Sequence, residues 1–204
     1  MKRMTAFCVL SLLFICLATA QGNFKDKRIT YLWDVTLSMK GFKGSPNIWK
    51  DVVRVMTEDI NKINDQRTEI VVVPFQNSAY CEVWREQATP QGKQAIIKKI
   101  KSYDKNNETG TCISAPLEYA IKNIFTVDKI DIMKLLTDGQ DNVNPQRLNQ
   151  VLSQWCDMTK QKDVTGYYIT LTAAARNGEL TRRLDAICNF EEIDASTDLN
   201  GIAD

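Results

Sequence analysis

The sequence predicts an α/β fold: a doubly wound, mostly parallel central sheet with helices on both faces and one antiparallel edge strand. Short apolar segments rich in β-branched residues alternate with longer segments whose apolar residues recur every three or four positions. This alternation is typical of strands joined by crossover helices, which build a parallel sheet. One apolar strand is followed after a short polar turn by a loosely alternating segment, which predicts the antiparallel edge.

In the first half of the chain, turn residues and a change of period separate the predicted elements. Continuous apolar runs predict strands buried on both faces, and Pro74 is expected at a strand end because proline cannot donate to a central ladder. Apolar residues at helical spacing with charges between them predict amphipathic helices. In order, we expect a strand at 29–35, a helix at 48–63, a strand at 69–75, an antiparallel strand at 80–87, and helices at 91–103 and 113–124.

The second half of the chain repeats strand and helix. An apolar run is stopped by Thr137-Asp138-Gly139, and the next apolar residues return to helical spacing. A last helix and a short apolar strand close the pattern. The predicted elements are a strand at 130–136, a helix through 148–155, a strand at 165–172, a helix at 180–188 and a strand at 190–193.

Residues 1–20 have the pattern of a secretory signal peptide. Two basic residues precede an apolar run at 6–17, and small residues precede Gln21. The run is shorter than the roughly 20 apolar residues of a spanning helix, so no transmembrane segment is predicted. We expect an exported protein, periplasmic, cell-surface or secreted, with residues 21–204 as a single domain whose core covers about 27–193. A lipid anchor at Cys16 is the alternative.

Charge and composition exclude several classes of function. Loss of the signal segment leaves 24 Lys and Arg against 25 Asp and Glu, a formal charge of −1, which argues against nucleic acid or an anionic membrane as the main partner. The chain contains no histidine. Ser-His-Asp and Cys-His catalysis and His-containing zinc sites are therefore excluded.

Four of the six cysteines remain after cleavage, and an even number in an exported chain favours two disulfides. Cys156 and Cys188 close neighbouring predicted helices that finish at the same end of the sheet, so we expect them to pair. Cys81 and Cys112 are both predicted near the opposite edge and form the second candidate pair. Four buried free thiols are the alternative.

Two predicted strands end beside aspartates, Asp34 and Asp138, at the edge where α/β sheets bind ligands. Hydroxyls follow Asp34 at alternate positions, Thr36 and Ser38, so the three side chains can point the same way in an extended loop. Oxygen-only ligands favour a hard cation. The pattern predicts a divalent cation, with Mg²⁺ preferred and Mn²⁺ or Ca²⁺ as alternatives.

With these loops, the chain resembles a von Willebrand factor type A (vWA) domain over roughly residues 27–193. That family carries a metal-ion-dependent adhesion site (MIDAS) with an Asp-x-Ser/Thr-x-Ser loop, a Thr from a second loop and an Asp from a third. The matching residues are Asp34, Thr36, Ser38, Thr111 and Asp138. Thr109 is a second candidate for the Thr111 role, and Cys112 stands where many relatives carry a polar residue.

The resemblance implies that hydroxyls bind the metal directly, that the aspartates act directly or through water, and that an open coordination position takes a carboxylate from a partner. We therefore expect a binding module for a protein or polymer, in adhesion or envelope assembly, and not an enzyme. The alternatives are a structural subunit stabilised by metal, or a phosphotransferase using Asp34 and Lys134. The latter lacks its usual acid at position 36. Asp141 and Asn142 are expected in a solvated loop, with a place in the lining of the site as the alternative.

Overall fold

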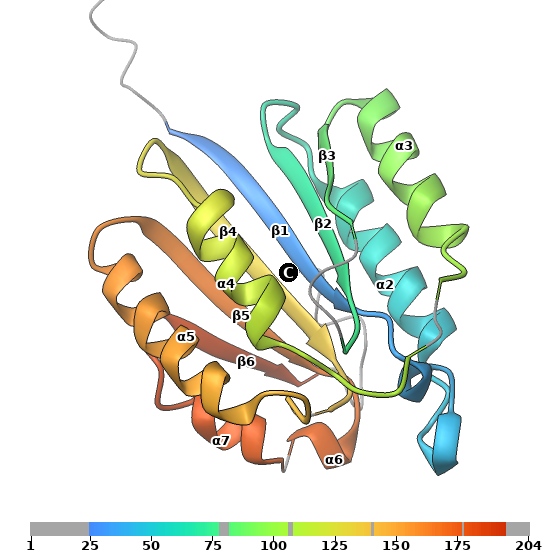
Figure 1. Ribbon diagram of the computed structural model, residues 1–204. Coiled ribbons are helices and arrows are strands. Elements are labelled where there is room, and N and C mark those ends of the chain that lie inside the picture. The colour runs from blue at the N-terminus through green and yellow to red at the C-terminus, as the bar shows by residue number, and fades with distance from the viewer. Residues whose placement is uncertain (1–24, 78–81, 106–107, 140, 177, 195–204) are drawn as a thin grey trace, which may run out of the picture.

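A computed structural model describes residues 25–77, 82–105, 108–139, 141–176 and 178–194 (Figure 1). The predicted signal segment, Cys16 and Cys81 lie outside these residues. Among the described residues, no helix combines the length and the apolar character needed to cross a membrane.

The core of the structure is a six-stranded sheet with the strand order β3-β2-β1-β4-β5-β6. Only β3 runs antiparallel to its neighbour, at one edge, and the other pairs are parallel. The predicted fold class is thus confirmed. The strands are β1 (Asp26–Asp34), β2 (Glu69–Phe75), β3 (Trp84–Gln87), β4 (Lys129–Thr137), β5 (Asp163–Thr170) and β6 (Phe190–Asp194).

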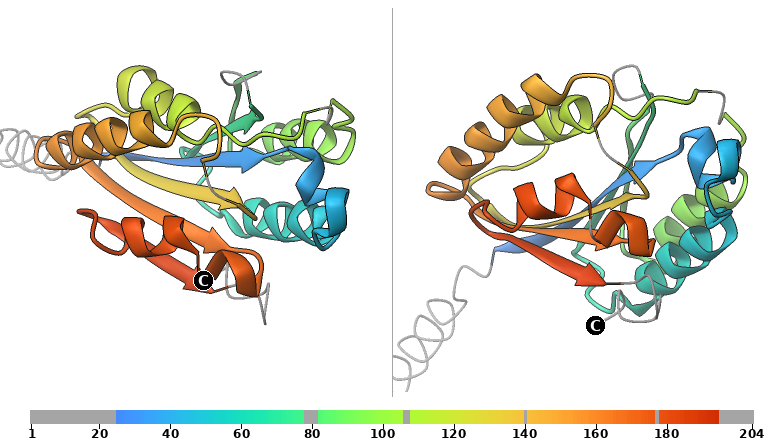
Figure 2. Two further views of the ribbon diagram at one scale, coloured as in Figure 1. Left: turned by 60° about the horizontal axis from the view of Figure 1, so that its bottom comes forward. Right: turned by 90° about the horizontal axis from the view of Figure 1, so that it is seen from below.

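Helices cover both faces of this sheet (Figure 2). One apolar cluster joins α2 and α3 to one face of β1 and β2, and a second joins α4, α5 and α7 to the other face. Short 3₁₀ turns follow β1. The helical elements are η1 (Leu37–Met39), η2 (Phe42–Gly44), α2 (Trp49–Lys62), α3 (Pro90–Lys101), α4 (Ser114–Asn123), α5 (Pro145–Thr159), α6 (Ala173–Arg176) and α7 (Glu179–Leu184).

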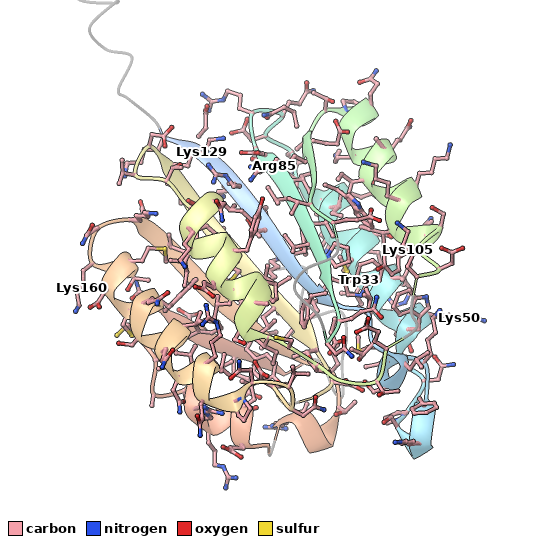
Figure 3. The ribbon with its side chains drawn as sticks, viewed as in Figure 1. Trp33, Lys50, Arg85, Lys105, Lys129 and Lys160 are labelled. Carbon is pink, nitrogen blue, oxygen red and sulfur yellow. The ribbon has the colours of Figure 1, made fainter. Side chains whose placement is uncertain are left out.

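The alternation of β1 residues between the two clusters explains why this strand reads as a continuous apolar run. Tyr31 and Trp33 belong to the cluster with α2, whereas Leu32 belongs to the cluster with α4. The Trp33 ring, labelled in Figure 3, stacks on Trp49 of α2 with 4.9 Å between ring centroids. Packing on both faces fixes the carboxyl end of β1, where Asp34 is the last residue.

Some predicted boundaries are wrong, most clearly at the end of the chain. The helix expected at 180–188 ends at Leu184, because the chain must turn before β6. Asn189 adopts a left-handed conformation in this turn (φ 53°), which asparagine tolerates better than most residues. Cys188 therefore lies in a turn and not at a helix end. Strand β5 begins two residues earlier than predicted, at Asp163, and ends at Thr170.

Candidate metal centre

Asp34 and Thr137 are the last residues of neighbouring parallel strands, β1 and β4. Trp33 pairs with Leu136 in the register of these strands, so both chains leave the sheet at the same edge. The turn η1, which follows β1 at this edge, carries Ser38. In the same turn, the Leu37 amide donates to the Glu108 carbonyl at 2.9 Å, which brings in the loop before α4. Three loops distant in sequence thus meet at the carboxyl end of the sheet, at the lower end of the molecule in Figure 1.

The first loop forms a chain of short polar contacts. Asp34 Oδ1 accepts from the Thr36 amide at 2.9 Å and from its hydroxyl at 2.7 Å. The Thr36 hydroxyl lies 2.8 Å from Ser38 Oγ, which donates to Asp138 Oδ1 at 3.0 Å. The two aspartates are therefore linked through two hydroxyls.

The second loop brings Thr111 to the same point. Its buried hydroxyl donates to Asp34 Oδ2 over a long 3.5 Å contact. Thr111, and not the alternative Thr109, is therefore the threonine of this loop that reaches Asp34. All five side chains singled out in the sequence lie together in one network.

Thr137 belongs to the network as well, although the sequence interpretation missed it. Its hydroxyl donates to Asp34 Oδ2 at 2.6 Å and accepts from the Gly139 amide at 3.2 Å. A signal was available: Thr137 follows Met133 and Leu135 at alternate positions, and these residues lie on the same sheet face as Leu32. The side chains of Thr137 and Asp34 must therefore point to one side of adjacent strands.

The prediction of a solvated loop at Asp141 is wrong. Asp141 is 5% exposed, and its carboxylate accepts from the amides of Ser114 at 2.9 Å and Asn144 at 2.8 Å. The reason lies in α4, whose N-cap position, Ile113, offers no side-chain acceptor to the first free amides of the helix. Asp141 supplies that acceptor from a distant loop.

Asn142 is exposed, as expected for a solvated loop, yet its side chain is held in place. Its Oδ1 accepts from the Thr111 amide at 2.9 Å, and its own amide donates to the Thr111 carbonyl at 3.1 Å. Together with the Asp141 contact to Ser114, this ties the Thr111 loop to the loop that follows Asp138. Hydrogen bonds therefore join the second loop of the site, which carries Thr111, to the third, which follows Asp138.

Burial disfavours the charged form of both aspartates. Asp34 is fully buried, and its pKa rises to about 6; the hydroxyls of Thr137 and Thr36 lower it only in part, and the nearby Asp138 raises it further. Burial also raises the pKa of Asp138. Among the described residues, neither aspartate takes part in an ion pair.

The donor set fits a hard cation. Two carboxylates and three hydroxyls are oxygen donors of the kind that Mg²⁺ and Ca²⁺ prefer, and a cation would relieve the cost of the buried Asp34 carboxylate and the partly buried Asp138 carboxylate. The described residues contain no group of three or more His, Cys, Asp or Glu arranged to hold a metal. Metal binding here therefore depends on the hydroxyls of Thr36, Ser38 and Thr111 as well as on the aspartates.

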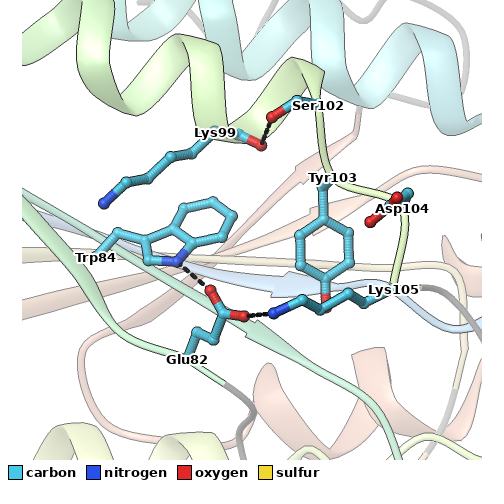
Figure 4. A pocket seen from close by; sticks show the side chains of 7 residues that line it. All are labelled: Glu82, Trp84, Lys99, Ser102, Tyr103, Asp104 and Lys105. Carbon is cyan, nitrogen blue, oxygen red and sulfur yellow. Dashed lines mark hydrogen bonds and ion pairs between the residues drawn. The ribbon is translucent and has the colours of Figure 1, made fainter.

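A polar pocket lies elsewhere, between β3 and the end of α3 (Figure 4). It has a volume of about 260 Å³, and Glu82 in its wall accepts from Trp84 Nε1 at 2.7 Å and pairs with Lys105. Lys99 lies 5.9 Å from the Trp84 ring centroid. This pocket contains none of the metal-site residues.

The cysteine pair predicted from the sequence is adjacent in space. Cys156 lies in the last turn of α5, and its Sγ accepts from the Cys188 amide at 3.3 Å. Both are free thiols in the structure, as is the buried Cys112, whose Sγ lies 3.6 Å from Ser114 Oγ. The second predicted pair cannot be followed, since Cys81 falls outside the described residues.

No protein-family model matches the sequence, and no curated protein sequence matches it. Solved structures share the fold at low identity. A von Willebrand factor type A protein from Catenulispora acidiphila is 16% identical, with a TM-score of 0.66 over 88% of this chain and 41% of that chain. The pilus adhesin SpaC from Lactobacillus rhamnosus GG is 16% identical, with a TM-score of 0.63 over 89% of this chain and 30% of that chain.

Proximal thread matrix protein 1 of the mussel byssus is 17% identical, with a TM-score of 0.63 over 88% of this chain and 46% of that chain. A further structure of that mussel protein has a zinc-occupied MIDAS motif. The present chain spans less than half the length of each of these three proteins. Strand order, the single antiparallel edge and these likenesses agree, and the chain has the fold of a von Willebrand factor type A domain.

Proposed function

We propose that this protein is an exported binding module that captures a carboxylate of a protein or polymer partner through a divalent cation. The cation is held by Asp34, Thr36, Ser38, Thr111 and Asp138. The observation that carries the proposal is the hydrogen-bonded network that joins these side chains around the buried Asp34 and the partly buried Asp138, with no ion-pair partner for either carboxylate among the described residues.

The donor chemistry favours Mg²⁺ over a transition metal, because every candidate ligand is oxygen and none is imidazole or thiolate. With only two carboxylates, the ion keeps a positive charge density that attracts a further anionic ligand. A mussel protein of this fold with zinc in its MIDAS supports a divalent cation in this place. The side chains of the site would hold the metal at the sheet edge, where it would offer a binding position to a carboxylate of the partner.

Capture is favoured over turnover. The adhesin and thread-matrix proteins that share the fold support a role in binding. The phosphotransferase alternative needs Lys134 near the aspartates, but Lys134 donates to Asp59 of α2 at 2.7 Å, in an ion pair on the α2 side of the sheet. A hydroxyl at position 36 also leaves that chemistry without its usual second acid.

The test uses a polyglutamate-coated sensor, with an uncharged hydroxyl-coated sensor as the reference. In Mg²⁺ we expect wild-type protein to bind the polyglutamate, and we expect chelator or Asp34→Asn to remove that binding. Ser45→Ala, outside the network, serves as the control variant. Binding that is unchanged in chelator would show that the metal is not the contact. Metal-dependent melting without any carboxylate binding would favour the structural-subunit alternative.

Export and a Cys156–Cys188 disulfide complete the proposal. The Cys188 amide contact to Cys156 Sγ supports pairing in an oxidising compartment. We expect protein recovered from the exported fraction to lack residues 1–20. Alkylated without reduction and then digested, it should yield one disulfide-linked peptide pair that joins positions 156 and 188 and separates on reduction. Peptide mass mapping with and without reductant makes the measurement. Four alkylated thiols in unreduced protein would contradict the pairing.

A further inference from the structure

A groove lies between α4 and α5, which run side by side in Figure 1. Its volume is about 450 Å³, within the range of sites that bind small molecules or peptide side chains. Its lining includes successive turns of one face of α4 and the start of α5. A cavity of about 250 Å³ that Asp141 and Asn142 help to line is smaller.

The groove borders two loops of the candidate metal centre, although none of the five metal-site residues lines it. Cys112, which lines the groove, directly follows Thr111, and the Ser114 amide at the groove edge is held by Asp141. On the opposite side, Val143 packs so closely on Gly110 that a β-carbon at that position would lie 3.0 Å from its Cγ2. A ligand on the metal would therefore lie next to the groove opening.

The groove wall is apolar where it meets the metal loops. Ala115 and Tyr119 lie one turn apart on α4, and Val143 faces them from the loop before α5. Val143 is 46% exposed, and only two other large hydrophobic side chains of the described residues are comparably exposed. An exposed valine beside a groove is more costly in water than under a partner side chain.

The far rim of the groove carries excess positive charge. Glu118 is largely buried and pairs with Lys122 and with Arg147, whose Nε donates to it at 3.1 Å. Two cations thus share one carboxylate, and both remain about half exposed. The surplus charge favours an acidic group at this rim.

We propose that this groove receives an acidic peptide segment of a protein partner, beginning with the residue on the metal. The first acidic side chain binds the cation, the next apolar side chain enters between Ala115, Tyr119 and Val143, and a second acidic side chain meets Arg147 and Lys122. This inference rests on the metal-dependent capture proposed above and names its partner chemistry.

The probe is a displayed peptide library with a fixed aspartate and random flanking residues, selected on the protein in Mg²⁺ and released with EDTA. We expect released peptides to be enriched in an apolar residue close to the aspartate and in a second acid beyond it. A synthetic peptide of the enriched sequence is then measured by fluorescence anisotropy against variants. Val143→Asp and Arg147→Gln should each weaken binding about tenfold, because each removes a proposed contact with the peptide and Val143→Asp also adds a charge that repels an acidic peptide.

Two controls separate the groove from the metal and from folding. Lys99→Gln, in the pocket of Figure 4, should bind the peptide as wild type does. All three variants should keep the Mg²⁺-induced rise in melting temperature, which reports an intact fold and an intact metal site.

Failure of the groove proposal and failure of the proposed metal function would give different results. Peptides released by EDTA that show no flanking preference, and that bind Val143→Asp and Arg147→Gln like wild type, would overturn the groove proposal and leave metal-dependent capture standing. If the protein yields no EDTA-released peptide and no Mg²⁺-induced rise in melting temperature, the proposed metal function fails, and the groove proposal fails with it.

Discussion

The two ends of the sheet both hold buried carboxylates, but they balance their charge differently. At the amino ends of the strands, Glu69 pairs with Arg28 at 3.0 Å and with Lys129 at 2.7 Å, and Asp131 lies 3.5 Å from Arg28. Arg85 adds another contact to Glu69, and Figure 3 labels it with Lys129 at that end. At the carboxyl ends, Asp34 and Asp138 contact hydroxyls instead.

The two ends of the sheet differ in the groups that stabilise the charged form of their carboxylates. Burial raises the pKa of Asp131 to about 6, as it does that of Asp34, but Arg28 acts against the shift at Asp131, whereas only hydrogen-bond donors do so at Asp34. The chain supplies its own cations at one end of the sheet. At the other it supplies oxygen ligands, an arrangement suited to a cation from solution.

The largest expected effect is at the amino end. Arg28→Met should lower the free energy of unfolding by about 3–5 kcal/mol, because it removes the ion-pair partner of the buried Asp131 carboxylate, whereas Glu69 keeps Lys129 and Arg85. The matched variant Arg85→Met, whose side chain is 40% exposed against 4% for Arg28, should cost less than about 1 kcal/mol. Urea denaturation of both variants makes the comparison. Equal losses would mean that burial does not distinguish the two arginines.

Metal addition should act only at the carboxyl end. Mg²⁺ at about 100 times its dissociation constant should stabilise wild type by about 2.7 kcal/mol, and Asp34→Asn should abolish the gain. Asp131→Asn, which removes a buried charge at the other end, should keep it. Thermal unfolding with Mg²⁺ or EDTA is the measurement. A gain that persists in Asp34→Asn would place the ion elsewhere.

Thr137 tests how far hydroxyls substitute for a cation. In metal-free buffer, Thr137→Val should cost about 2 kcal/mol, since the buried Asp34 carboxylate loses a charge-assisted hydrogen bond. The control is Thr30→Val, which removes a buried hydroxyl without a hydrogen-bond partner and should be neutral or stabilising. The free energies of unfolding are measured by chemical denaturation. Equal values for the two variants would show that the Thr137 hydroxyl does not stabilise the Asp34 carboxylate.

A further expected effect is on pH dependence. The pKa of Asp34 is raised from 3.8 to about 6 in the folded protein, so its contribution to stability is present below pH 3.8 and is lost as pH rises through 6. Saturating Mg²⁺ should remove this loss, while that of Asp131 over the same window should remain. Glu69, whose pKa is lowered from 4.5, acts in the opposite direction and mainly below pH 4.5. Stability measured from pH 4 to 7 with and without Mg²⁺ tests the difference.

The features that the sequence predicts well are those set by local period and by strand ends. Asp34 and Asp138 follow apolar runs, so their common edge follows from parallel topology alone. Asp141 is different, because its role depends on an uncapped helix 27 positions away in the chain. Likewise, the end of α7 depends on where β6 must begin, and the groove depends on how α4 packs against α5. Such features come from tertiary distances that no local pattern contains.

The position of β1 and β4 at the centre of the sheet has a mechanical consequence. Each of these strands is hydrogen-bonded on both sides along its length, and the Thr111 loop is tied to the loop that follows β4 through Asn142. A pull on a partner held at the metal would therefore load two central strands along their axes. The hydrogen bonds between these strands and their neighbours would then be loaded in shear, so that many would have to break at the same time before a strand could be pulled out of the sheet.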